Sequence, residues 1–188
     1  MNQVLVIDNA GHRSVAPTLE FTALDSYGEA LSDVWVTTVF GSDLGDLVVP
    51  PGESADVLVF EGAGSDRVED VRVFVKDAAV VDFPLIRSDV EVEPLDAEGR
   101  PVTRNDRFTS VALHNDNPDP VAVRLVYIIW TDPPPSRTQQ AERVLPVGDL
   151  IVVPARGTVT VPMEGEADLA NAMAAGRVAA SIKAYFSR

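Results

Sequence analysis

The feature that most constrains this chain is a series of short apolar segments with alternating side-chain character, separated by turn-forming clusters. The clearest segment, residues 71–75, reads Val-Arg-Val-Phe-Val, and a period of two places successive side chains on opposite faces of a strand. Clusters of Asn, Pro and Gly follow the segments, as at residues 9–11 and 50–52. Many short strands with this spacing predict an all-β sandwich or barrel.

The same pattern runs along the whole chain. We expect strands at residues 3–8, 18–24, 34–40, 47–49, 56–60, 71–75, 89–95, 108–113, 121–131, 144–153, 158–161 and 177–186. One helix is expected over residues 168–175, which are rich in good helix formers, begin with an acid and end before Gly176. Hydrophobic residues make up 46% of the chain but aromatic residues only 6%, so valine, leucine, isoleucine and alanine must build the cores.

Two matches in the same order indicate an internal duplication. Residues 45–50 read Gly-Asp-Leu-Val-Val-Pro, and residues 148–154 read Gly-Asp-Leu-Ile-Val-Val-Pro. Residues 6–9 are placed like residues 112–115. The boundary between the copies is expected near Pro84, because proline cannot donate to a β-ladder. The second copy begins with a strand, residues 89–95, whose counterpart would lie before Met1. Either the first copy is a reduced sandwich, or its open edge is covered by something else, such as a strand from a partner.

A family resemblance lies in the first copy. Residues 19–31 read Leu-Glu-Phe-Thr-Ala-Leu-Asp-Ser-Tyr-Gly-Glu-Ala-Leu, and residues 51–54 read Pro-Gly-Glu-Ser. This arrangement resembles the FxLYD-type immunoglobulin-like modules of bacterial envelope proteins. Asp25, Gly28 and Leu31 stand where those modules have an aspartate, a glycine and a leucine, while Leu24 stands in place of their tyrosine. The resemblance implies a sandwich fold and an adhesive or scaffolding role, with no catalytic residues to transfer. The predicted fold is therefore all-β, with two tandem immunoglobulin-like antiparallel β-sandwich domains at residues 1–84 and 85–188 and one short crossover helix.

Charge and composition exclude several classes of function. Fifteen basic residues stand against 29 acidic ones, giving a net charge of −14, so a nucleic-acid-binding face or an anionic membrane surface is not expected. The chain has no cysteine, which removes disulfides and thiolate chemistry. No apolar run approaches the roughly 18 residues of a membrane span, and residues 1–7 lack the basic leader of a signal peptide. We expect a virion, cell-surface or extracellular location without membrane insertion.

Catalytic residues are scarce. His12 and His114, both beside predicted turns, are the two histidines of the chain, and a Ser-His-Asp arrangement would have to use one of them. Neither a Gly-x-Ser-x-Gly elbow nor a phosphate-binding Gly-x-x-x-x-Gly-Lys loop is present. The sequence predicts that the protein is not an enzyme and needs no cofactor, and calcium is the one metal ligand considered.

Calcium is considered because one loop is dense in oxygen donors. The candidate ligands are Asn115, Asp116, Asn117 and Asp119, and calcium takes carboxylate and amide oxygens from loops. The alternative is that these residues only form a turn, for which Asn, Asp and Pro are well suited.

A proline-rich loop is the predicted site of partner binding. Its candidate residues are Trp130, Asp132, Pro133, Pro134, Pro135 and Arg137. A run of prolines is stiff and extended, so it would bind a partner at a low entropic cost. The alternative is a long hairpin excursion with Trp130 in the core. Trp35, within an alternating strand, is expected in the core, and Tyr27 is the best-placed aromatic for stacking on a sugar.

Together these observations predict a non-catalytic structural or interaction protein, a subunit or accessory module of a larger assembly on a virion or a cell surface. Its expected partners are proteins within an oligomer or larger assembly. The alternative is a secreted carbohydrate-binding or adhesion module, which calcium would stabilise.

Overall fold

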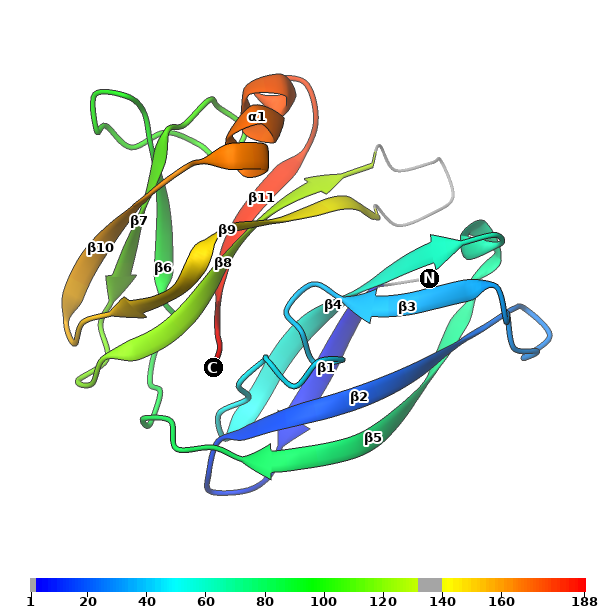
Figure 1. The fold of residues 1–188 in the computed structure, drawn as a ribbon. Coiled ribbons are helices and arrows are strands. Elements are labelled where there is room, and N and C mark those ends of the chain that lie inside the picture. Colours follow the sequence, from blue (N-terminus) through cyan, green and yellow to red (C-terminus); the bar gives the residue numbers. More distant parts are fainter. Residues whose placement is uncertain (1–2, 132–139) are drawn as a thin grey trace. The chain divides into compact units, whose positions relative to one another are not determined.

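The structure is a computed structural model that describes residues 3–131 and 140–188. It is mostly β, with 53% of the residues in strands and 7% in helix, and its sheets are antiparallel (Figure 1). The all-β prediction is therefore confirmed. The described residues divide into two compact units, unit 1 ending at Phe83 and unit 2 starting at Pro84.

Unit 1 is sandwich-like, with a three-stranded sheet and a two-stranded ribbon. Its strands are β1 (Val4–Asn9), β2 (Val15–Leu24), β3 (Val34–Thr38), β4 (Gly52–Gly62) and β5 (Asp70–Val80), and a 3₁₀ turn, η1, covers Ser65–Arg67. The sheet has the order β1-β4-β3, and β2 pairs with β5. Between the two layers lies a small cluster in which Ala23, Val34 and Val68 are buried.

Unit 2 has two three-stranded sheets, ordered β10-β7-β6 and β11-β8-β9. Its strands are β6 (Glu91–Leu95), β7 (Ser110–Asn115), β8 (Val121–Trp130), β9 (Ala141–Val153), β10 (Gly157–Pro162) and β11 (Ala180–Phe186). The helix α1 (Gly165–Ala174) connects β10 of one sheet to β11 of the other, as expected of a crossover. Within the core, the rings of Phe108 and Tyr127 meet edge to face at 6.0 Å, and burial raises the pKa of Tyr127.

The two units differ in how much they bury. Among the described residues, the largest fully buried side chains lie mostly in unit 2, including Tyr127, Phe108, Leu113, Leu125 and Ile128. Unit 1 contributes Val48 and Val49 to this group. Because hydrophobic stabilisation scales with the apolar area removed from water, unit 2 holds the stronger core.

The same turn follows a strand in each unit. In unit 1 the Asp25 carboxylate accepts the backbone N–H groups of Tyr27 and Glu29, at 2.8 and 3.0 Å. In unit 2 the Asp96 carboxylate accepts those of Glu98 and Arg100, at 3.0 and 2.9 Å. An aspartate that bonds to the backbone two residues on is typical of a tight turn. The pattern Asp-x-x-Gly therefore encodes a chain reversal at both places.

Most expected elements form, with shifted ends. The segment 47–49 is an exception, since Val49 makes only an isolated bridge to Val15 rather than a strand. Trp35 is the second difference: its side chain is 66% exposed, so the prediction that it lies in the core is wrong. In β3 the neighbouring Val34 is buried, and alternation along a strand places Trp35 on the opposite, outward face.

Candidate interaction surface

Exposed apolar side chains concentrate on unit 1. Among the described residues, nine of the fourteen exposed large hydrophobic side chains belong to it: Val4, Val6, Tyr27, Trp35, Leu44, Val73, Phe74, Val75 and Val80. Single exposed hydrophobic residues are ordinary, but a contiguous group marks an interaction site. Four of these nine side chains lie on β5, so this strand is the centre of the candidate surface.

The inner face of β5 is apolar but only partly covered. Val71, Val73 and Val75 stand opposite β2 residues whose side chains share their face, Val71 opposite Ala23 and Val75 opposite Leu19. Ala23 and Leu19 are buried, whereas Val73 and Val75 remain 40% and 58% exposed. Among the described residues, β5 has a neighbouring strand, β2, on one side only, so its side chains lie at the edge of this layer. The outermost valines are therefore left in contact with water.

The outer face of β5 is amphipathic. Phe74 is 64% exposed and stands opposite Glu20 of β2. Lys76 lies beside it and pairs with the Glu20 carboxylate at 2.8 Å. This hydrogen bond and the attraction of the opposite charge raise the pKa of Lys76 above its ordinary value of 10.5. Arg72 and Asp70 complete the face, which thus presents one aromatic ring among charges of both signs.

The pairing of β2 with β5 is interrupted at one place. The register shifts between Thr18 and Leu19, because Thr18 stands opposite Asp77 while Leu19 stands opposite Val75. Lys76 is thus the extra residue of a β-bulge, which bends and twists a strand and ends regular pairing. The regular part of β5 therefore runs from Asp70 up to the bulge at Lys76.

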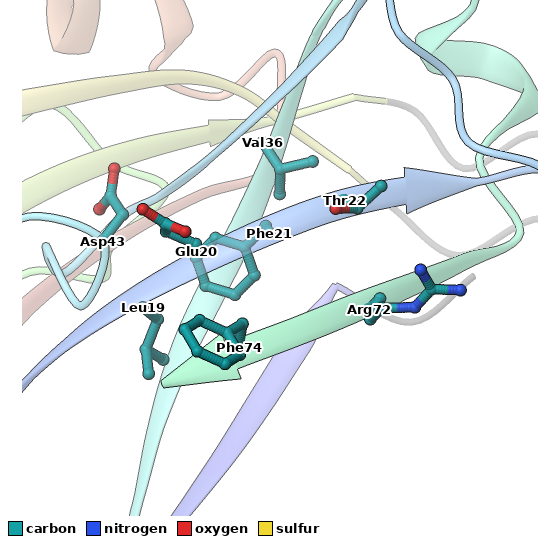
Figure 2. Close-up of a pocket in the computed structure, with 8 residues that line it drawn as sticks. All are labelled: Leu19, Glu20, Phe21, Thr22, Val36, Asp43, Arg72 and Phe74. Carbon is teal, nitrogen blue, oxygen red and sulfur yellow. The ribbon is translucent and has the colours of Figure 1, made fainter. Parts of the chain in front are cut away.

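A pocket of about 370 Å³ adjoins this surface. It is lined by Leu19, Glu20, Phe21, Thr22, Val36, Asp43, Arg72 and Phe74 (Figure 2). Figure 2 shows the two carboxylates, Glu20 and Asp43, at one end and the Arg72 guanidinium at the other. Its lining is therefore charged at both ends and apolar between them, which suits a side chain of a partner better than a small apolar ligand.

A buried polar network holds the loop that supplies Asp43. Asp56 is fully buried, and its two carboxylate oxygens accept the backbone N–H groups of Phe40 and Ser42 at 2.8 and 3.1 Å. The Thr38 hydroxyl donates to the Asp43 carboxylate at 2.6 Å. Because buried carboxylates need such donors, this network fixes the loop and positions the acidic end of the pocket.

In the predicted calcium loop, the side chains of Asn115 and Asn117 form hydrogen bonds within the protein. The Asn115 side-chain oxygen accepts the backbone N–H of Asn117 at 3.0 Å. The Asn117 side-chain oxygen accepts the backbone N–H groups of Arg87 and Ser88 at 2.7 and 3.2 Å. Both asparagines are buried, and the carboxylates of Asp116 and Asp119 are exposed. The two amide oxygens thus act as acceptors within the protein in this structure.

The predicted partner loop can be placed only at its start. Trp130 ends β8 half-buried, and its indole N–H donates to the Ser181 hydroxyl at 2.9 Å. This bond ties the tryptophan to β11. Asp132, Pro133, Pro134, Pro135 and Arg137 lie outside the described residues.

The histidines are placed on the surface. His12 is exposed. The His114 ring lies 2.9 Å from the Thr158 hydroxyl and 3.6 Å from the Glu93 carboxylate, a combination of groups also used in catalysis. Here all three belong to neighbouring strands of one sheet, and Glu93 and His114 are 42% and 35% exposed. A nucleophilic site needs a water-excluding cleft and oxyanion donors as well, so cross-strand pairing is the simpler account of this group.

Sequence reasoning did not select Glu20, Arg72, Phe74 or Asp43. A signal for Phe74 existed, because the alternation in Val-Arg-Val-Phe-Val puts the ring on the face that carries Arg72. The pocket depends on a loop packing beside β2, which no local pattern encodes.

No protein-family model, curated protein or solved structure matches this chain. Over residues 3–131 and 140–188, no helix is long and apolar enough to cross a membrane. Within the same residues, no group of three or more His, Cys, Asp or Glu side chains is placed to hold a metal ion.

Proposed function

We propose that the protein is a non-catalytic structural or interaction protein, a subunit or accessory module of a larger assembly on a virion or a cell surface. Its two units would be tandem immunoglobulin-like sandwiches, as the resemblance to FxLYD-type modules implies. The observation that carries the proposal is β5, a strand with apolar side chains exposed on both faces and with β2 as its one partner among the described residues.

Two further features support a binding role. An open strand edge is a template for pairing with another chain, and monomeric proteins usually protect it. The net charge of −14 keeps the protein soluble despite its apolar surface. An assembly subunit needs both properties, because it must stay soluble until its partner covers the surface.

The test is the size of the particle that contains the protein in its native source. Extracts, particles and medium are separated by gradient sedimentation, and the protein is detected with an antibody. We expect it in a particle much larger than the 20.2 kDa chain. Recovery of the protein only at the size of its monomer or dimer, in every fraction, would show that it belongs to no larger assembly.

A second candidate function is carbohydrate binding or adhesion, favoured by the exposure of two aromatic side chains. Tyr27 is 89% exposed at a turn, and Trp35 is 66% exposed on the outward face of β3. Exposed aromatic rings stack on sugars. A glycan array tests this function, and Trp35→Ala should abolish any binding that the array detects. Calcium stabilisation is tested with it, since a bound ion raises the melting temperature by mass action and an unchanged melt in millimolar calcium would exclude it.

A further inference from the structure

We propose that β5 pairs with β5 of a second copy of this chain, antiparallel and about a two-fold axis at Val73. This inference deepens the proposed function, on which it rests, by naming the surface and the partner. The pairing would extend each β2–β5 ribbon into a four-stranded sheet in the order β2-β5-β5-β2. The reasons are the edge of β5 that no strand among the described residues pairs with, the position of the bulge and the charges along the strand.

The two-fold symmetry limits the register. Directly opposite residues point to the same face of a sheet, and the axis relates the two copies of each residue. Opposite positions must therefore be separated by an even number of residues. The regular edge from Asp70 to the bulge at Lys76 has Val73 at its middle, so pairing about Val73 uses all of this edge.

This register places opposite charges together, valines together, and an arginine opposite an aromatic ring. The opposed pairs are Asp70 with Lys76, Val71 with Val75, Arg72 with Phe74, and Val73 with its own copy. By symmetry each unlike pair occurs twice, giving two pairs of opposite charge at the ends and two pairs of an arginine with an aromatic ring. Opposite charges and cation–π contacts both stabilise neighbouring strands.

The adjacent registers are worse. Moving the axis to Phe74 places Arg72 opposite Lys76, two like charges. Moving it to Arg72 places Arg72 opposite its own copy. Moving it to Val75 takes the pairing across the bulge and places Val73 opposite Asp77. Like charges directly opposite each other destabilise a sheet, so they disfavour the axes at Phe74 and Arg72, and the bulge at Lys76 disfavours the axis at Val75.

The pairing would also cover the exposed inner face. Val73 and Val75, 40% and 58% exposed, would stand beside Val73 and Val71 of the second copy. The valines that a two-stranded ribbon leaves in water would thus lie within a four-stranded sheet.

Cysteine cross-linking of the full chain tests the geometry, because the natural sequence has no cysteine. In Val73→Cys, the two new thiols would lie opposite each other, with Cβ atoms about 5 Å apart. We expect a short thiol-reactive cross-linker to give a covalent dimer. Val80→Cys is the matched control on the same strand, since its two copies would be roughly 45 Å apart at about 3.3 Å per residue. A second probe, Asp70→Cys with Lys76→Cys, should form disulfides between chains only.

Charge exchange tests the register. Lys76→Glu places two acids opposite each other. It should lower the association constant of the dimer at least tenfold, as measured by light scattering over a range of concentrations. Adding Asp70→Lys restores an opposite pair and should recover the dimer, while the Glu20 contact stays disrupted in both variants. Lys183→Glu is the matched control, because it makes the same charge change at an exposed position of β11 and should leave the dimer unchanged. Circular dichroism verifies that each variant is folded.

The outcomes separate this inference from the proposed function. A dimer that cross-links at residue 73, weakens with Lys76→Glu and recovers with the exchange supports the inference. A monomer at high concentration without cross-linking, or a dimer indifferent to Lys76→Glu, overturns it. In that case a large native particle would still support the proposed function, with another chain on β5. A native protein found only as the dimer would overturn the proposed function alone.

Discussion

Asn9 and Asn115 share three kinds of side-chain hydrogen bond, each formed once in each unit. Each side-chain amide donates to the carbonyl four residues ahead, Arg13 at 2.8 Å and Asp119 at 2.9 Å. Each donates to the carbonyl of a valine, at 3.0 and 3.3 Å, and each side-chain oxygen accepts the N–H two residues ahead at 3.0 Å. The strand pairings agree, since β1 pairs with β4 as β7 pairs with β10.

Replacing these asparagines should destabilise both units, to different extents. Asn115 is buried and also donates to Pro154, so Asn115→Ala removes its bonds to three carbonyls, those of Asp119, Val153 and Pro154, and should cost about 3 kcal/mol. Asn9 is half-buried, and Asn9→Ala should cost about 1 kcal/mol. Urea unfolding measures both. Asp116→Ala, at an exposed neighbouring position, should be close to neutral, and equal losses for all three variants would contradict this account.

Gly62 should tolerate no side chain. Its φ is 105°, and a Cβ there would collide with the Asp33 carbonyl and lie 2.9 Å from the Trp35 ring. Gly52 has nearly the same φ, 102°, but open space around it. Gly52→Ala should therefore cost about 1–2 kcal/mol from backbone strain alone, and Gly62→Ala about 2 kcal/mol more because of the collisions. Thermal melts compare the two variants. A Gly62→Ala protein as stable as Gly52→Ala would mean that the backbone around residue 62 shifts at little cost in free energy.

Arg107 should hold α1 against the rest of unit 2. Its guanidinium donates to the side chains of Asn171 and Asp168, at 2.7 and 2.6 Å, and to the Phe108 carbonyl at 2.6 Å. Arg107→Ala should lower the stability of unit 2 by about 2 kcal/mol and speed amide hydrogen exchange in α1 more than in β8. Arg177→Ala, an exposed arginine after the same helix, serves as the control. Unchanged exchange in α1 would show that its apolar contacts suffice.

The Asp96 turn should respond to acid. The backbone N–H of Arg100, followed by its side chain, lowers the pKa of Asp96 below the ordinary 3.8. Since the folded pKa is the lower one, the stabilisation is complete above the ordinary Asp pKa and is lost as the pH falls through the folded value. Carboxyl NMR titration measures this pKa. Arg100→Ala should raise it only in part, because the backbone donor remains.

Asp106 provides the reference in that experiment. The Thr103 hydroxyl and N–H lower the pKa of Asp106, and neither depends on Arg100. Its titration should be the same in Arg100→Ala, so parallel shifts at both carboxyls would indicate a general loss of structure instead.

The strands could be read from sequence because alternation and turn residues are local. The Val71–Val75 segment predicts β5, and its alternation puts Phe74 on the same face as Arg72. The error at Trp35 has a physical cause: Val34 and Trp35 are both apolar, so periodicity alone cannot say which of them faces the core. Pairing of β3 with β4 decides this, with Val36 opposite Phe60 on the inner face.

The candidate surface was beyond local patterns for another reason. Exposure of Val73 and Val75 depends on how many strands flank β5, and the position of Asp43 depends on the buried Asp56 network. Both are properties of packing between segments distant in sequence. The calcium and proline-loop hypotheses came from composition, which identifies donors and stiff segments but not the hydrogen bonds that occupy Asn115 and Asn117.

If β5 pairs with a second copy, the smaller buried core of unit 1 makes the stability of this unit depend on protein concentration. Any chain that binds the folded form alone adds to the free energy of unfolding as its concentration rises, so unit 1 should melt at a higher temperature in concentrated solution, whereas the melt of unit 2 should stay fixed. In a newly made, dilute chain, unit 2 would then be stably folded on its own. Unit 1 would reach its full stability only once a partner binds.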